Sequence, residues 1–164
     1  MASLNSFDIV SDYDQQELKN ALDQVDRELV QRYDLKDTDT TIEHKGEELI
    51  ITTNSENTLR SVRDVIETKF VKRGLSLKIL DYGKEEPAAG SRVRQTVKLK
   101  KGIPDDLAKQ LTKRIREEHK KVTPQIQGNT IRVQSKSLDD LQEVIASLKE
   151  DETIPVALQF TNYR

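Results

Sequence analysis

The spacing of apolar positions alternates along the chain between two residues, typical of a strand, and three to four, typical of a helix. In the first half this pattern predicts a strand, a helix, two hairpin strands, a helix and a strand, over residues 6–11, 14–33, 40–45, 48–53, 55–74 and 75–80. In the second half the same order is predicted over residues 92–101, 104–119, 122–127, 130–135, 137–148 and 156–163. The chain therefore reads as an internal repeat.

The two halves match each other at an offset of 82 residues. The matched positions cover a hairpin turn, a strand core, a helix cap and a helix stripe: Gly46 with Gly128, Leu49 with Ile131, Ile51 with Val133, Ser55 with Ser137, Leu59 with Leu141, Val62 with Val144 and Ile66 with Leu148. Each half has the β-α-β-β-α-β order of a ferredoxin-like domain. We predict an α+β protein of two tandem ferredoxin-like sandwiches, each a four-stranded antiparallel sheet with two helices on one face.

The predicted boundary between the domains is a segment with turn-forming residues. Gly83, Pro87 and Gly90 lie within 82–91, which we interpret as a linker between domain 1 at 1–81 and domain 2 at 92–164. The pattern leaves open whether the strand at 6–11 stays in its own repeat or pairs with the other sheet.

The segment 92–101 combines a strand pattern with strong positive charge. Its cations and its aliphatic residues alternate, so a strand would place Arg92, Arg94, Lys98 and Lys100 on one face, opposite Val93, Val97 and Leu99. A sheet packed on one side and basic on the other suits an anionic partner, most commonly one that carries phosphate.

Composition changes this picture mainly through the distribution of charge. The 164 residues carry 27 Lys and Arg against 29 Asp and Glu, a net charge of −2. The stretch 1–60 carries −8, 61–91 carries +1, 92–136 carries +9 and 137–164 carries −4. The basic block supports an anion-binding role, although screening limits its field to roughly 8–10 Å at physiological salt.

Several classes of function find no support in the residues. The chain contains no cysteine, no Gly-x-x-x-x-Gly-Lys-Ser/Thr loop and no Gly-x-Gly-x-x-Gly sequence. Its two histidines, His44 and His119, are expected at the surface of a hairpin and at a helix end. We predict no enzyme, no catalytic residues, no metal site and no cofactor. No apolar run approaches the ~20 residues of a membrane span, and no secretory signal begins the chain, so we expect a cytoplasmic protein without membrane association.

Several blocks, taken in order, resemble the YajQ family of bacterial proteins. They are Ser6–Ser11, Lys72–Gly74, Lys98–Ile103, Gln125–Gly128, Ile131–Val133, Ser135–Ser137, Asp139–Gln142 and Gln159–Arg164. The resemblance implies two tandem domains similar to RNA-recognition motifs and a non-catalytic protein that binds nucleotides or nucleic acid, with cyclic di-GMP binding attributed to some members.

The candidate binding residues are the polar side chains expected on the open sheet face, with a few cations beside it. They are Arg92, Arg94, Lys98, Lys100, Lys101, Gln125, Gln127, Arg132, Gln134, Lys136, Tyr163, Lys72 and Arg73. Arginine pairs with phosphate, and amides can read base edges. The alternative is a solvated face. True RNA-recognition motifs stack bases on aromatics, and only Tyr163 offers a stacking ring here, so strong binding of single-stranded RNA is not expected.

The expected ligand is a nucleotide, a cyclic dinucleotide such as cyclic di-GMP, or an RNA such as tRNA. The alternative is a protein-interaction or regulatory module that docks an acidic partner on the same basic face. Helix 104–119 and Lys120–Lys121 carry further cations, either a solvated surface or a phosphate contact. The run Leu49–Ile51 is apolar on both faces of its strand, so that sheet is either covered on its second face, by the other domain or a second subunit, or locally irregular.

Overall fold

The computed structural model describes residues 3–164 and divides into two compact units. One unit is the single segment Tyr13–Lys100, called here the continuous unit. The other combines the segment that ends at Asp12 with Lys101–Arg164, and is called here the split unit. Each is a four-stranded antiparallel sheet with two helices, so the predicted α+β architecture of two ferredoxin-like domains is confirmed.

The continuous unit contains two helices and four strands. They are α1 (Gln15–Gln31), β2 (Thr41–Lys45), β3 (Glu48–Thr53), α2 (Glu56–Lys72), β4 (Leu80–Ala88) and β5 (Arg92–Leu99), with a short 3-10 helix, η1 (Leu77–Ile79), before β4. The sheet order is β2-β3-β5-β4. Leu18 and Val25 of α1 and Leu59 and Ile66 of α2 share one core with the sheet, so both helices cover the same face.

The split unit contains β1 (Asn5–Val10), α3 (Asp105–Glu118), β6 (Thr123–Gln127), β7 (Thr130–Ser135), α4 (Leu138–Glu150) and β8 (Gln159–Thr161). Its sheet order is β6-β7-β1-β8. Phe7 of β1 and Val133 of β7 pack with Leu111 of α3 and Val144 of α4. The other face of this sheet is open and carries polar residues.

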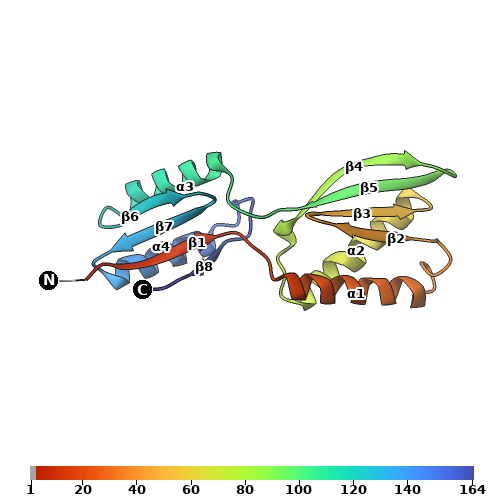
Figure 1. Ribbon diagram of the computed structural model, residues 1–164, viewed down its shortest axis with the longest axis horizontal. Helices are drawn as coiled ribbons and strands as arrows, with labels where there is room; N and C mark the ends of the chain where they lie inside the picture. The colour runs from red at the N-terminus through yellow and green to blue at the C-terminus, as the bar shows by residue number, and fades with distance from the viewer. Residues whose placement is uncertain (1–2) are drawn as a thin grey trace. The chain divides into compact units, whose positions relative to one another are not determined.

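The two repeats exchange their first strands. In Figure 1 the red strand β1 lies among the blue and cyan strands of the second repeat, and the green strand β5 lies beside the yellow strand β3 of the first. β1 pairs with β7 and β8, and β5 pairs with β3 and β4. Of the two possibilities for the strand at 6–11, the structure has the one in which it joins the other sheet.

The expectation that residues 82–91 form a linker is wrong. Residues 80–88 form β4, which pairs with β5 from Leu80–Leu99 to Ala88–Arg92, and the chain turns between them. Gly90 and Ser91 have positive φ angles of 76° and 60° in this turn. Pro87 lacks an amide donor, which an edge strand tolerates, and β4 is an edge strand. The domain boundaries predicted at 81 and 92 therefore cut through a hairpin.

Gly83 has a structural reason within β4. The register of β4 against β5 shifts between Tyr82 and Glu85, which marks a β-bulge. A Cβ atom on Gly83 would lie 2.8 Å from the backbone oxygen of Thr96, so a side chain would not fit there without displacement of the backbone. The glycine that suggested a linker instead permits close approach of two strands.

Two predicted strands are shorter or displaced. Half of the strand expected at 75–80 forms η1, and β4 begins at its last residue, Leu80. The strand expected at 156–163 is regular only over Gln159–Thr161. The other elements lie within a few residues of their expected positions. In the part of the chain that the structure describes, no helix is both long and apolar enough to span a membrane.

Candidate functional site

The predicted alternation of the basic strand is confirmed for its central residues. Arg94 and Lys98 of β5 are exposed, whereas Gln95, Val97 and Leu99 are buried against the helices. The open face of this strand is therefore basic in itself. It belongs, however, to the continuous unit, while the predicted residues 125–136 belong to the split unit. The single basic face expected from the sequence is divided between two sheets.

Neighbouring strands place carboxylates beside the cations of β5. Lys98 lies opposite Glu48 on β3 and opposite Asp81 on β4. Arg94 lies 3.4 Å from the carboxylate of Glu86. A phosphate that approached this face would meet acidic groups beside the basic ones.

Arg92, Lys72 and Arg73 have different environments. The guanidinium of Arg92 donates to the backbone oxygens of Thr38 and Asp39, at 3.3 and 2.5 Å. At the end of α2, Arg73 pairs with Glu17 of α1 at 2.8 Å, and this hydrogen bond lowers the pKa of Glu17. Lys72 is exposed. The two arginines thus link segments within the continuous unit, which fits a structural role better than a ligand contact.

The open face of the split unit centres on an ion pair. Arg132 of β7 lies opposite Asp8 of β1 and donates to its carboxylate at 3.0 Å, and Asn162 donates to the same carboxylate at 2.9 Å. The Asp8 residue is only 7% exposed. The Arg132 hydrogen bond, together with that of Asn162, lowers the pKa of Asp8 despite its burial. Arg132 is therefore already bound to an internal anion.

Amides and hydroxyls surround this pair. Gln125 lies opposite Arg132, Gln127 opposite Thr130, and Gln134 between Ser6 and Thr123. The amides of Gln125 and Gln127 are exposed, and Gln134 is partly buried. Of the predicted set, the structure brings Gln125, Gln127, Arg132 and Gln134 together on one face.

Tyr163 is not on this open face, contrary to the expectation. Thr161 lies opposite Asp8, but Arg164 exchanges backbone hydrogen bonds with Ser6, so the C-terminal strand has one extra residue between these two points. Asn162, with a φ of 55°, takes up the extra residue. The bulge turns Tyr163 toward Phe7, a core residue, at 6.2 Å between ring centroids. The ring is therefore not placed to stack a base over the polar face.

A pocket of about 330 Å³ lies where β6 and β7 meet the start of α4. Its lining combines two lysines, a glutamine, three hydroxyl residues and one leucine: Lys121, Lys136, Gln134, Thr123, Ser135, Ser137 and Leu4. Neither lysine forms an ion pair with any residue in the range 3–164. Two cations are therefore available to an anion in one hollow of the surface.

Two of the three hydroxyl groups of the pocket, those of Ser135 and Ser137, form hydrogen bonds within the protein. The Ser135 hydroxyl donates to the backbone oxygen of Lys121 at 3.1 Å and accepts from the amide of Ser137. Ser137 in turn caps α4 by accepting from the amide of Asp140 at 3.2 Å. These hydrogen bonds hold the backbone at Lys121 and on the C-terminal side of Lys136, so the backbone that carries both lysines is held in place by the protein.

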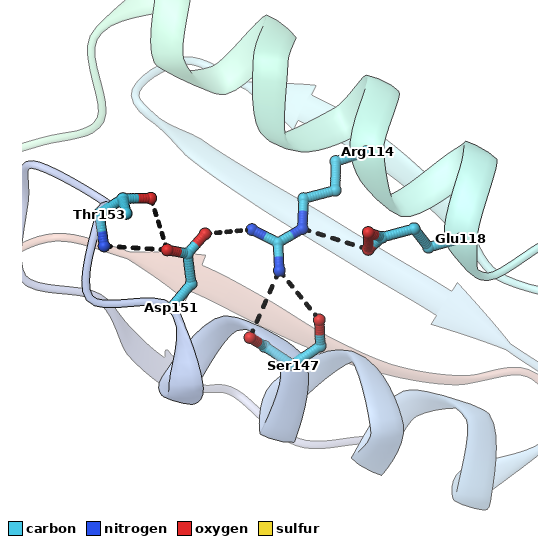
Figure 2. Close-up of polar contacts among 5 residues, drawn as sticks. All are labelled: Arg114, Glu118, Ser147, Asp151 and Thr153. Carbon is cyan, nitrogen blue, oxygen red and sulfur yellow. Dashed lines mark hydrogen bonds and ion pairs between the residues drawn. The ribbon is translucent and has the colours of Figure 1, made fainter.

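Two further cations of the basic block, Arg114 and Lys101, have acidic partners. Figure 2 shows Arg114 of α3 between Glu118 of its own helix and Asp151 and Ser147 from the α4 segment. Asp151 also accepts from the amide and hydroxyl of Thr153, and these bonds, with that of Arg114, lower the pKa of Asp151 to about 2. Lys101 lies 3.6 Å from Asp12. The hydrogen bonds of Arg114 thus connect α3 to the C-terminal part of α4.

The charge asymmetry of the sequence disappears in the folded units. The continuous unit contains 16 Lys and Arg against 17 Asp and Glu, and the split unit 11 against 12, so each carries a net charge of −1. Any attraction for phosphate must therefore come from local groupings of cations.

Comparisons with known proteins agree with the resemblance seen in the sequence. Residues 5–164 match the family model described as nucleotide-binding protein YajQ-like. The chain belongs to the YajQ-like family. A curated protein of Trichormus variabilis, named a nucleotide-binding protein, is 59% identical over 164 residues, with both chains fully covered. Proteins of the same name from Synechococcus sp. and Chloroflexus aurantiacus are each 60% identical, again over the full length of both chains. None of these names states an enzymatic activity.

Sequence reasoning found part of the pocket. Gln134 and Lys136 were among the predicted residues, and Lys121 was noted as a cation after a helix. Leu4, Thr123, Ser135 and Ser137 were not predicted to contribute. Leu4 could not have been placed there, because it reaches the pocket only through the exchange of β1. For Thr123, Ser135 and Ser137, the sequence feature that could have identified them is the cluster of hydroxyl residues near Lys121 and Lys136.

Proposed function

We propose that this protein binds a nucleotide through the split unit, with a phosphate group held by Lys121 and Lys136. The observation that carries the proposal is the pocket beside α4, in which two lysines that have no acidic partner within residues 3–164 lie among hydroxyl residues. The names of the full-length relatives support the same class of ligand.

The chemistry of the lining suits a phosphate ester. Two ammonium groups offset the charge of a phosphate, and the hydroxyls of Thr123 and Ser137 and the amide of Gln134 supply further hydrogen-bond donors. Leu4 adds an apolar surface at the rim, against which a sugar or base can pack. The volume of about 330 Å³ lies at the lower end of ligand pockets, which favours a mononucleotide portion over an extended polymer.

The base is proposed to lie toward the row of amides. Gln134 lines the pocket and belongs to the same sheet face as Gln125. Amide side chains can pair with base edges, at roughly 1–3 kcal/mol for a good bidentate contact. Arg132 is not assigned a direct role, since its guanidinium is bonded to Asp8.

The positive charge of the pocket is confined to Lys121 and Lys136, and this favours a small ligand. A cyclic dinucleotide would place one of its phosphates between the lysines, whereas tRNA would need a longer basic path. An acidic protein partner has no specific support, because the cations of β5 face carboxylates on both sides.

Titration calorimetry of the full chain tests this proposal. Nucleoside monophosphates, the matching nucleosides, a cyclic dinucleotide and tRNA are titrated into the same preparation at moderate salt. The double variant Lys121→Gln/Lys136→Gln should weaken nucleotide binding at least about tenfold, and nucleosides should bind much more weakly than nucleotides. The matched control Lys109→Gln/Lys113→Gln, on the exposed side of α3, should leave the affinity unchanged. Equal binding of nucleosides and nucleotides, or full affinity in the first double variant, would contradict the proposal.

A further inference from the structure

The open face of the continuous unit carries a row of alternating charges. Lys45, Glu48, Lys98 and Asp81 are successive register partners across the strands β2, β3, β5 and β4. All four side chains are exposed. Within residues 3–164, neither Glu48, Lys98 nor Asp81 forms an ion pair, although Lys98 lies opposite both acids. Lys45 pairs with Glu43 of its own strand at 3.2 Å, so three of the four charges in the row have no ion-pair partner within residues 3–164.

The side chains at the centre of the same face are uncharged. Ile50 of β3 lies opposite Thr96 of β5, and Thr52 lies on the same face one step along β3. Both helices of this unit pack on the opposite face, through Leu49 and Ile51. The run of three apolar residues in β3 thus places one isoleucine on a face that no helix of the unit covers.

The row of charges is self-complementary under a twofold rotation. A sequence of plus, minus, plus, minus reverses sign about its midpoint, which lies between β3 and β5. If a second copy is laid face to face by rotation about an axis parallel to the strands through this midpoint, β3 lies over β5 of the second copy and β2 over its β4. Glu48 then faces Lys98 of the other copy, and Lys45 faces Asp81.

We infer that this face pairs two copies of the chain in a symmetric dimer. Because the interface is isologous, each contact occurs twice, so the row supplies four ion pairs around the Ile50 and Thr96 centre. A rotation about the perpendicular in-plane axis would place each charged residue over the same residue of the other copy, so that like charges would meet. The charge pattern therefore selects one orientation.

The expected association is weak and depends on salt. Four strands about 4.8 Å apart and about six residues of about 3.3 Å span roughly 400 Å² on each copy. This is below the ~800 Å² per partner of a standard stable interface. Exposed ion pairs are also screened at high ionic strength. The dimer should form at high protein concentration in low salt and dissociate as salt is added.

Sedimentation analysis of the full chain tests the inference. Samples from about 10 to about 500 μM are compared in about 50 mM and about 500 mM NaCl. The unmodified chain should show a concentration-dependent dimer at the lower salt that is largely lost at the higher. Lys98→Glu should weaken association at least about tenfold, because Glu48 of the other copy then faces a like charge.

The charge-swapped double variant supplies the decisive comparison. Glu48→Lys/Lys98→Glu restores opposite charges across the interface, and its association should return to within about threefold of the original. Lys120→Glu, the same charge change at an exposed loop of the split unit, should have no effect. If Lys98→Glu does not fold by circular dichroism, the neutral Lys98→Gln takes its place and should also weaken the dimer. A chain that stays monomeric in low salt, a dimer indifferent to Lys98, or a folded swap that stays weak would each overturn the inference.

Discussion

At the scale of single residues, the partners on adjacent strands decide what a charged side chain can do. Arg132 and Arg94 look equally available in the sequence, but each lies beside a carboxylate in the structure, Asp8 and Glu86 respectively. Lys121 and Lys136 have no such partner among residues 3–164. The most promising cations for a ligand are therefore two that stand apart from the most basic strand.

Asp8→Asn should reduce the free energy of unfolding at neutral pH by about 1–2 kcal/mol, because a nearly buried carboxylate that accepts hydrogen bonds from two side chains, Arg132 and Asn162, is lost. The folded state lowers the pKa of Asp8, so its stabilising effect is present above the unfolded pKa near 3.9 and is lost as the pH falls through the folded pKa. Urea unfolding at several pH values should show that the difference between the two proteins shrinks below about pH 4. Glu152→Gln, an exposed control, should leave the curves unchanged.

The carboxyl group of Asp151 should titrate with a pKa of about 2 in the folded protein, which carbon-detected NMR can measure. Thr153→Ala removes the hydroxyl donor and should raise this pKa toward its ordinary value of 3.8. Any stabilisation from Asp151 should accordingly be lost only as the pH falls from its unfolded pKa toward 2. A midpoint that does not move in Thr153→Ala would contradict the assigned cause.

At the scale of elements, the β4–β5 hairpin explains why the two units do not match the two repeats. β5 lies in the middle of its sheet, between β3 and β4, and contributes Val97 and Leu99 to the core. β1 holds the same place in the other sheet and contributes Phe7 and Ile9. A central strand cannot be removed without loss of two ladders of hydrogen bonds and part of the core.

The fragment 13–100 should therefore fold on its own, with cooperative urea unfolding and a dispersed NMR spectrum. The fragment 13–91, which lacks only β5 and its junction, should not fold. The fragment 92–164, which the sequence suggested as a complete domain, lacks β1 and should also fail to fold. A cooperative transition in 92–164 would show that β1 is dispensable and would contradict this account.

At the scale of the whole molecule, the fold distributes charge evenly between units. Each unit has a net charge of −1, although the sequence contains a block of +9. The exchange of β1 and β5 is part of the cause, since it places strongly basic β5 with the acidic first repeat. Binding of an anion is expected to depend on the position of a few lysines and only weakly on the overall field.

The folded fragment 13–100 should consequently bind no nucleotide that the full chain binds, because Lys121 and Lys136 lie outside it. A version of the split unit in which a short Gly/Ser linker joins Asp12 to Lys101 should retain most of the affinity. Fluorescence titration with a labelled nucleotide measures both. Comparable affinity of the fragment 13–100 and the full chain would place the site in the continuous unit.

Local pattern was sufficient to predict the fold class and most of its elements. The 82-residue offset of the hairpin turns, with Gly46 and Gly128 at φ angles of 58° and 62°, reflects local constraints that each repeat meets in the same way. The alternation in β5 was likewise readable, since a half-buried strand must place its apolar residues on one side. The family followed from short blocks spread over the whole chain.

The sequence by itself thus determined the repeat, the helices, the β2–β3 and β6–β7 hairpins and which residues of most strands face a core. Only the tertiary structure decided which core the strands β1 and β5 enter, because both have the same apolar alternation and either could complete either sheet. As a result, Lys98 and Arg132 lie in different sheets, and the residues expected to form a linker belong to the β4–β5 hairpin. For the same reason, Leu4 lines the pocket of Lys121 and Lys136. The physical reason is that alternation specifies a face of a strand, whereas the neighbours across the sheet depend on contacts between residues far apart in the chain.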